Sequence, residues 1–520
     1  MRSSVDAAKT TDENKRHWAN ANGLGPNATF DEATRQKCRN RGRYEGLNNS
    51  YAHGLGRSMA YDLIGTGPRP QLGIPGDENG DAARIVERNY AKWARAVALG
   101  RKYRLMEKSA VFAGEVFGVL NTNLRVKNPI KLDLRLLEAE QCTSPWNLPA
   151  NANVIDGILF DEQWNPVEYY FLRQHPGETS MMGYTAQDQF QTVAARNVIH
   201  WYEQDRPGQV RGIPKITSSL PNFAQLRRVR LATLTAMEFA AMLAGVMKTA
   251  LPPLDGSAVT VDNWELFELV RGALLTLPAG WEATQFKPEQ PTTNFEMFNR
   301  EVLNECGRGV GAPLNVVTGN SSQYNFSSGR LDHVPYQAGL WIDRDDFELV
   351  CAEPVFMAWE ENARAWSAAN PNMPAQVDPS LPPIDEWTIT WDWDGFGSID
   401  PVKDANADDT RIKDGTEHYA GALGARGVNW RSHFEQIAQE KAYAESLGLT
   451  YPLLSNAPSA AQPAPGTMEE TVAAAMEEAG VTESKAAEVL DMLSATFAQV
   501  RAKPINGHRF NGHAMAGGSN

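Results

Sequence analysis

The sequence predicts an α+β fold that is mainly helical. Apolar residues recur at helical spacing in several long segments, most clearly between Ser219 and Thr249. Three short runs rich in apolar and β-branched residues lie between residues 131 and 173, separated by turns that contain Pro and Gly. The length of 520 residues exceeds one ordinary hydrophobic core, so we expect roughly two to four domains or one elongated subunit.

The first 215 residues are expected to combine short helices with strands. Residues 1–46 are polar and offer little to bury, which predicts an arm or a short surface helix. The Gly- and Pro-containing turn Ile64–Pro70 ends the first predicted helix of this region. The predicted helices are Leu47–Met59, Ile85–Gly100 and Met106–Leu120, and the predicted strands are Lys131–Leu137, Val154–Phe160 and Val167–Arg173.

The strongest helical pattern covers Ser219–Thr249 and stops before Pro252 and Pro253. Pro221 is tolerated because it falls in the first turn. A helix of about thirty residues spans roughly 45 Å, which suits a strut in an assembly better than a small core. Its apolar face is formed by Phe223, Leu226, Leu231, Leu234, Met237, Met242 and Val246.

A segment rich in Gly, Ser and Asn, Gly307–Arg330, lies between two predicted helices. The first helix begins near Thr293, and the second is predicted to run from Ser328 to Trp366 with a kink at Pro354. A polar loop of this length is uncommon inside a compact domain unless it has a function. We therefore expect a functional loop held between two rigid helices.

The chain after Trp366 is expected to return to a strand and then to helices. A proline-rich connector precedes a strand-like segment at Trp387–Trp391. Asp400 is placed to cap a helix whose first position is Pro401. The remaining segments are predicted to be helices to about Leu447, a linker at Ser455–Gly466, a helix at Met468–Ala502 and a disordered tail.

Composition limits the classes of function. The formal net charge of −14 argues against a protein that coats nucleic acid by bulk attraction. No run of about 18 apolar residues and no signal-peptide pattern is present, so we expect a soluble, cytoplasmic protein without a membrane partner. The four cysteines stand far apart and are expected to be reduced.

Sequence patterns for catalysis or metal binding are weak. Residues 77–81 resemble a calcium loop, but Ala82 and Arg88 stand where such a loop needs Gly and Glu. Asp392 and Asp394 could form an acid/base or metal-binding pair in a strand-like segment, but no third ligand lies nearby in the sequence. Cys306 and His333 could form a nucleophile and base, but no residue supplies an oxyanion site. Motifs for nucleotide binding and for hydrolases are absent. We predict no catalytic residue, no metal and no cofactor.

Cationic residues are the better candidates for contact with a ligand. On a monomer such residues are often no more than a solvated face. In a ring of identical subunits, symmetry repeats each cationic residue in every copy. Cationic side chains contact nucleic-acid phosphates and do not distinguish base sequences. The candidate phosphate contacts are Arg227, Arg228, Arg230, Arg300, Arg308 and Arg330.

Several short motifs, in order over roughly residues 45–450, resemble the lambda-type phage portal family. They include the loop segment Ala312–Arg330 with its Asn-Phe-Ser-Ser-Gly-Arg ending and the earlier run Ile64–Gln71. The remaining motifs are Asn49–Ala52, Leu136–Gln141, Ile155–Ile158, Val198–His200 with Arg211–Pro214, Ile399–Lys403 and Glu440–Ala442.

The resemblance implies a ring, commonly of twelve subunits, that surrounds a central channel. It implies that the loop faces double-stranded DNA, bound without sequence specificity, through Asn315, Thr318, Asn320, Ser321, Ser322, Gln323, Tyr324 and Asn325. The regions it implies are an N-terminal arm (1–46), an α+β wing (47–215), a first stem helix (216–250), a clip (251–291), a second stem helix (292–311), a tunnel loop (312–328), a long kinked helix (329–369), wing return strands (370–399), crown helices (400–454) and a linker with a C-terminal tail (455–520).

The same resemblance implies a structural role and no enzyme activity. The ring would sit at one capsid vertex of the virion after assembly in the host cytoplasm, and would conduct DNA during packaging and ejection. Its implied partners are further copies of itself, the major capsid and scaffold proteins, the terminase large subunit and a head-completion or adaptor protein. Two alternatives remain open from the residues: a non-portal virion or scaffold-binding protein, and a carbohydrate-active virion enzyme that uses the paired aspartates.

Overall fold

The chain divides into two units, Met1–His433 and Phe434–Asn520. The elements below belong to the first unit, except that the last helix crosses the boundary. No helix in the described part of the chain is long and apolar enough to cross a membrane. The computed structural model describes residues 12, 15–145, 153–178, 189–242, 246–249, 281–284, 293–322, 324–397 and 401–449.

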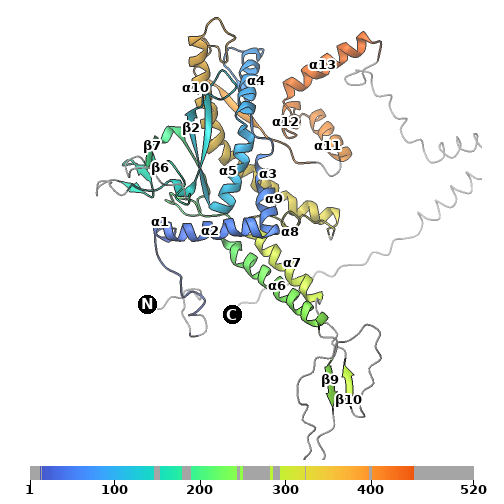
Figure 1. Ribbon diagram of the computed structural model, residues 1–520. Helices are drawn as coiled ribbons and strands as arrows, with labels where there is room; N and C mark the ends of the chain where they lie inside the picture. The colour runs from blue at the N-terminus through green and yellow to red at the C-terminus, as the bar shows by residue number, and fades with distance from the viewer. Residues whose placement is uncertain are drawn as a thin grey trace, which may run out of the picture. The chain divides into compact units, whose positions relative to one another are not determined.

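Helices form one side of the first unit (Figure 1). Asp31 caps α2 by accepting a hydrogen bond from the Thr34 amide, and the side chain of Asn49 caps α3 in the same way. Arg35, Arg39 and Glu45 of α2 are buried, so the prediction that residues up to 46 form an arm or surface helix is wrong from Glu32 onward. The helices are α1 (Pro26–Thr29), α2 (Glu32–Asn48), α3 (Ser50–Ile64), α4 (Asp81–Ala96) and α5 (Leu99–Ala113).

A three-stranded antiparallel sheet follows α5, in the order β3-β2-β8. The predicted helix Met106–Leu120 is wrong in its second half, because α5 ends at Ala113 and β2 begins at Glu115. Gly114 makes the turn with a φ of 94°, and a Cβ there would lie 2.6 Å from the Ile213 carbonyl carbon. The strands are β2 (Glu115–Thr122), β3 (Leu132–Glu138) and β8 (Val198–Tyr202), which confirms the strand predicted near 131–137.

A second sheet, in the order β4-β5-β6-β7, is also antiparallel. The single strand predicted for Val154–Phe160 is a hairpin, because Asp156 and Gly157 turn the chain with φ values of 48° and 87°. An Asp-Gly pair favours this two-residue turn. The strands are β4 (Val154–Ile155), β5 (Ile158–Phe160), β6 (Pro166–Leu172) and β7 (Phe190–Ala194).

Two helices, α6 (Leu220–Met242) and α7 (Thr293–Arg308), lie side by side (Figure 1). The predicted helix to Thr249 is too long, since Val246–Thr249 is a strand (β9) paired antiparallel with β10 (Trp281–Thr284). Backbone pairing with a distant strand outweighs the helical periodicity that continues to Val246. The remaining residues of the 251–291 region lie outside the described residues.

The long helix predicted for Ser328–Trp366 consists of three parts. They are α9 (Phe326–Phe347), a π-helical turn (Glu348–Ala352) and α10 (Glu353–Ala369). The π turn ends two residues before Pro354, which lacks the amide hydrogen that a continuous α-helix would use there. A π-helical turn therefore interrupts the α-helix close to the position where the sequence predicted a kink.

The chain returns after α10 to complete the first unit. β11 (Thr388–Asp392) confirms the predicted strand and pairs antiparallel with β1 (Arg69–Gly73). The sequence did not predict β1, because Gly and Pro residues before it indicate a turn. The apolar core at this end contains buried Trp93, Tyr90, Phe356 and Trp359, whose rings pack against each other. The last described helices are α11 (Pro401–Lys413), α12 (Tyr419–Gly424) and α13 (Trp430–Ser446).

Candidate functional site

The segment predicted to be a polar loop is partly ordered by a short helix. After α7 ends at Arg308, a tight turn leads to α8 (Leu314–Thr318), and α9 begins at Phe326. The prediction of an irregular loop over 312–328 is therefore corrected. Buried Ala312 and Val317 pack into the core that also holds Phe223 of α6. This apolar contact orders the first half of the segment and leaves its second half polar.

Two glycines allow this turn to pack closely. A Cβ at Gly307 would lie 2.5 Å from the carbonyl oxygen of Ala312, and one at Gly309 would lie 2.5 Å from Oγ of Ser219. The Ala312 amide donates to the Gly307 carbonyl at 2.9 Å. These glycines are therefore required for close packing.

The predicted DNA-facing residues divide into anchored and exposed groups. Asn315 donates from Nδ2 to Nε2 of His333 at 2.8 Å, which joins α8 to α9. Asn325 caps α9 by accepting from the Ser328 amide at 2.8 Å, and Thr318 donates to the Leu314 carbonyl at 2.9 Å. Tyr324 is half-buried, and Gln323 lies outside the described residues. The exposed group is Asn320, Ser321 and Ser322.

The candidate arginines do not form one cluster. Arg227 forms an ion pair with Glu45 at 2.8 Å and lies over the ring of Tyr44, and Arg230 lies over the ring of Tyr51. These contacts hold α6 against α2 and α3. The exposed candidates are Arg228 on α6, Arg300 and Arg308 on α7, and Arg330 on α9.

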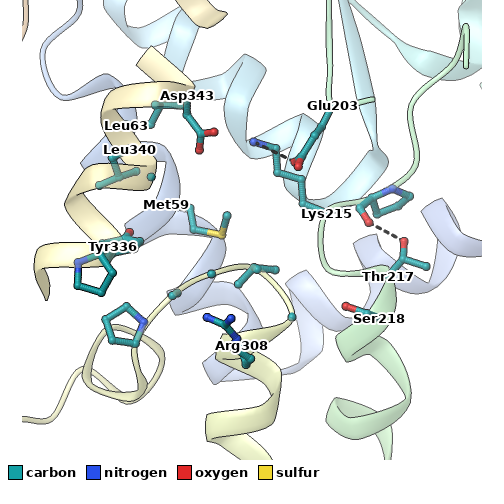
Figure 2. A pocket seen from close by; sticks show the side chains of 18 of the residues that line it. Met59, Leu63, Glu203, Lys215, Thr217, Ser218, Arg308, Tyr336, Leu340 and Asp343 are labelled. Atoms are coloured by element: carbon teal, nitrogen blue, oxygen red, sulfur yellow. Dashed lines mark hydrogen bonds and ion pairs between the residues drawn. The ribbon is translucent and has the colours of Figure 1, made fainter. Parts of the chain in front are cut away.

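A cavity of about 870 Å³ lies at the base of the segment. It is bordered by α3, α5, α9, the turn after α7 and the chain after β8 (Figure 2). Figure 2 shows Arg308 at one edge, with Asp343, Lys215 and Glu203 at the opposite edge. The segment that the sequence singled out therefore closes one side of a charged cavity.

The charges around this cavity are only partly paired. Lys215 contacts Glu107 at 2.9 Å and Glu203 at 3.8 Å. Burial opposes the charged form of Lys215, but Glu107, Asp343 and Glu203 together raise its pKa. Burial raises the pKa of Asp343, although Lys215 acts in the opposite direction. The cavity is lined by five carboxylates (Glu107, Glu203, Asp205, Asp332 and Asp343) and by two cations (Lys215 and Arg308).

A second charged group is centred on fully buried Glu115, and its partners all come from the same chain. Its carboxylate accepts from Arg211 Nη2 at 2.7 Å, from the Gly212 amide at 3.0 Å and from His200 Nε2 at 3.0 Å. Burial alone would raise the pKa of Glu115, but Arg211 and His200 hold it well below its usual value. The sequence contained one clue, because a carboxylate inside an apolar strand requires a partner.

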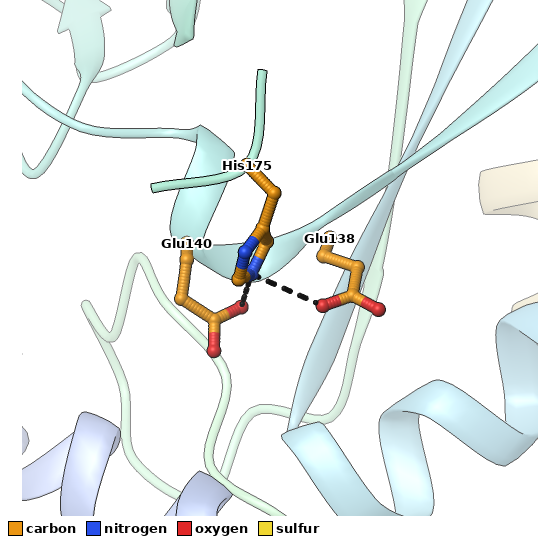
Figure 3. A group of neighbouring side chains, drawn as sticks. All are labelled: Glu138, Glu140 and His175. Carbon is orange, nitrogen blue, oxygen red and sulfur yellow. Dashed lines mark ion pairs between the residues drawn. The ribbon is translucent and has the colours of Figure 1, made fainter. Parts of the chain in front are cut away.

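Glu138, Glu140 and His175 form a third group, in which one ligand atom of each lies within 4.8 Å of the others (Figure 3). This spacing is compatible with a metal ion. The two carboxylates, however, already bind Arg43, whose nitrogens lie 2.9 Å from Glu138 and 2.6 Å from Glu140. An arginine that bridges both carboxylates explains the cluster as an ion-pair network.

The weak catalytic patterns have structural explanations. Asp394 accepts hydrogen bonds from the backbone and side chain of Thr66, and its ion pair with Arg69 is 3.0 Å long. Asp77 accepts from the Ala83 amide at 2.8 Å and so stabilises the turn before α4. Burial raises the pKa of the Cys306 thiol to about 12, which disfavours a nucleophilic thiolate. All four cysteines are free.

Comparisons with known proteins identify a relative in sequence and more distant neighbours in structure. A probable portal protein of the Halomonas phage phiHAP-1 is 22% identical over 441 residues, which cover 80% of this chain and 82% of the relative. Among solved structures, the neck of an empty GTA particle gives a TM-score of 0.41 at 10% identity, over 74% of this chain and 92% of that one. The virion of a native gene transfer agent particle gives the same score and identity, over 75% and 93%.

The family comparison extends from the N-terminal helices through most of α9. Residues 11–340 match the family described as phage portal protein, lambda family. The match spans α1 to α8 and most of α9, together with the three-stranded and four-stranded sheets and the polar segment. It covers well over half of the 520 residues. The chain therefore belongs to the lambda family of phage portal proteins.

Proposed function

We propose that this portal protein forms a closed ring around a central channel at one capsid vertex. The channel conducts double-stranded DNA during packaging and ejection. The observation that carries the proposal is the uncovered apolar surface of α6 and α7. Leu231 and Leu234 of α6 are 64% and 53% exposed, and Met297 of α7 is 62% exposed.

The α6–α7 pair buries only part of its apolar surface within one chain. Phe223 and Leu226 of α6 pack with Leu303 and Cys306 of α7 and are buried. The apolar residues farther along both helices remain exposed to solvent in the single chain. Side-by-side packing of copies around an axis would cover these residues, and such surfaces mark protein interfaces.

The regions of the subunit follow from this assignment. Residues 32–215 serve as the wing, since α2 packs with the wing helices. Helices α6 and α7 serve as the stem, and β9 and β10 lead toward the clip at 251–291. Residues 312–328 serve as the tunnel loop, 329–369 as the long helix, 370–399 as the wing return and 400–454 as the crown. In this scheme the wing meets capsid and scaffold proteins, and the clip meets the terminase large subunit and later a head-completion protein.

The exposed stretch Asn320–Ser322 is the part of the loop best suited to contact DNA. Amide and hydroxyl groups contact phosphates without reading sequence. The absence of a cation in this stretch and the formal charge of −14 keep attraction to DNA low. A channel needs this property, because DNA must slide through it in both directions.

The test combines electron microscopy with a packaging assay. We expect negative-stain images and native mass measurements of the full chain to show closed rings with a central hole. Deletion of Asn315–Asn325 would remove most of the loop, but Asn315 and Asn325 anchor the neighbouring helices. The sharper variant replaces only Asn320–Ser322 by three alanines and should leave rings intact while impairing DNA packaging or retention.

Two results would contradict the proposal. A uniform monomer under assembly conditions would contradict the ring, and full-length packaging by the triple-alanine variant would contradict the loop assignment. The geometry does not favour either alternative function. Asp394 already binds Thr66 and Arg69, so it is not available as a catalytic acid or base. The enzyme alternative would require that the protein hydrolyses a polysaccharide and that Asp394→Asn abolishes this activity.

A further inference from the structure

We propose that the acidic cavity beside the tunnel loop binds the Arg330 side chain of the next copy in the ring. This inference rests on the proposed ring. It identifies the contact that would fix the tunnel-loop region of one subunit to its neighbour.

The first argument is the charge of the cavity. Five carboxylates face two cations there. Lys215 is engaged by Glu107 and Glu203. Among the described residues, Asp332 and Asp343 have no ion-pair partner within 4.0 Å, although both border the cavity. The lining has three more carboxylates than cations (five against two), so the cavity attracts a further cation.

The second argument concerns the kind of cation. Among the described residues, only Glu138, Glu140 and His175 bring three ligand atoms within 4.8 Å of one another, so no three carboxylates of the cavity can bind one metal ion together. A guanidinium has five donors on a planar head and can bridge separated carboxylates. A volume of about 870 Å³ also admits a long side chain.

The third argument is the geometry of α9. Residues that line the cavity recur along one face of this helix at Asp332, Tyr336, Leu340 and Asp343. Arg330 lies two positions before Asp332, which corresponds to roughly 200° of rotation at 3.6 residues per turn. Arg330 therefore projects from the opposite face of α9, where Val334 is 56% exposed.

Rotational symmetry connects these two faces. Neighbouring copies in a ring meet through different surfaces, and rotation about the axis keeps every atom at its own height. Arg330 and Asp332 are two positions apart on one helix, so they lie at nearly the same height. The Arg330 face of one copy can then meet the cavity of the next. Arg330 is exposed and forms no ion pair with another described residue.

The experiment measures ring assembly of the full chain by native mass spectrometry over a range of protein concentrations. We expect Arg330→Glu and Asp332→Arg each to raise the midpoint concentration for assembly by about tenfold or more, since tenfold corresponds to the loss of one moderate ion pair. Both residues are exposed in the single chain, so the variants should remain folded. Arg125→Glu, an exposed arginine in the turn between β2 and β3, is the matched control and should not change the midpoint.

Mixing the two variants tests whether the contact joins different copies. In a ring of alternating variants, every second interface pairs an unaltered Arg330 with an unaltered cavity. The interfaces between them pair the introduced glutamate of one copy with the introduced arginine of the next, so the charges are exchanged but still opposite. An equal mixture should therefore assemble at close to the wild-type midpoint.

Three outcomes decide between the inference and the ring on which it rests. Wild-type rings together with an unchanged midpoint for Arg330→Glu would overturn this inference and leave the proposed ring standing. Wild-type rings together with a mixture that assembles no better than either variant alone would also overturn it, because the two altered charges would then not meet. Failure of the wild-type chain to form rings would overturn both.

Discussion

The buried charges around Glu115 and those around Lys215 are assembled in similar ways and satisfied in different ways. Each group draws charged residues from distant parts of the chain. Glu115 accepts from Arg211, His200 and the Gly212 amide, so its carboxylate is fully engaged. Lys215 is also paired, but Asp343 beside it faces an open cavity. The closed group holds sheets and helices together, whereas the open group is available to a partner.

The different surroundings of the two groups explain this contrast. A buried carboxylate is tolerated only when its partners replace the water it has lost. Arg211 meets this requirement for Glu115 and also donates to the carbonyls of Ala139 and Cys142, which joins the start of β2 to the chain that follows β3. Asp343 is only partly buried at the edge of the cavity, so it is tolerated there without an ion-pair partner.

The largest expected effect comes from breaking the closed group. Glu115→Ala leaves the Arg211 guanidinium buried without its counter-charge, and we expect a loss of about 3–5 kcal/mol in the free energy of unfolding. Chemical denaturation of the full chain measures this. Glu138→Ala is the matched control, because Glu138 lies on a neighbouring strand and is 58% exposed; it should cost less than about 1 kcal/mol. If both variants lost the same free energy of unfolding, burial of Glu115 would not make its ion pairs more important for stability than those of exposed Glu138.

The next effect concerns the packed turn that closes the cavity. Gly307→Ala places a methyl group 2.5 Å from the Ala312 carbonyl oxygen, and we expect about 1–3 kcal/mol of destabilisation. Gly54→Ala in α3 has no atom within 4 Å of the new methyl group and should be neutral or stabilising by about 0.5–1 kcal/mol. Thermal unfolding of both variants tests this, and a neutral Gly307→Ala would contradict the packing role.

A smaller effect is the pH dependence of the open group. Burial raises the pKa of Asp343 above its ordinary value of 3.8, so the folded chain retains this proton to a higher pH than the unfolded chain. The wild-type chain must therefore lose stability relative to Asp343→Asn as pH rises through the raised pKa. In denaturation of the monomer we expect the advantage of Asp343→Asn to grow as pH rises from the ordinary pKa of 3.8, and to stay constant once pH has passed the raised pKa. An advantage that grows toward low pH would contradict the raised pKa.

The smallest effect on global stability is expected for Asn315→Ala. The Asn315–His333 hydrogen bond joins α8 to α9 and is only partly buried, so we expect about 1 kcal/mol or less in unfolding. Backbone amides of 314–318 should exchange hydrogen about fivefold faster, because that energy is lost locally. Asn320→Ala, at an exposed position in the same segment, is the control. Faster exchange throughout the chain would indicate a global role instead.

Local chemistry was predictable wherever a segment contains its own signals. The kink predicted at Pro354 coincides with the π-helical turn that ends at Ala352, although Pro335 lies inside α9 without interrupting it. The strands β3 and β6 follow from short apolar runs between turns. The hairpin at Asp156-Gly157 was predictable in principle, but the continuous apolar pattern on both sides concealed it. The strand after α5 was missed because an apolar run fits a buried strand as well as a buried helix.

The α+β class, most of the helices and the position of the polar segment were determined by the sequence itself, and so was the resemblance to lambda-type portals, because all of them depend on residues close together in the chain. Only the tertiary structure decided that Val246–Thr249 pairs with Trp281–Thr284, that Arg211 meets Glu115, and that Gly307 and Gly309 serve packing. Each of these depends on contact between segments far apart in sequence. The energy of such contacts exceeds local propensity, and no local pattern encodes which distant partner supplies it.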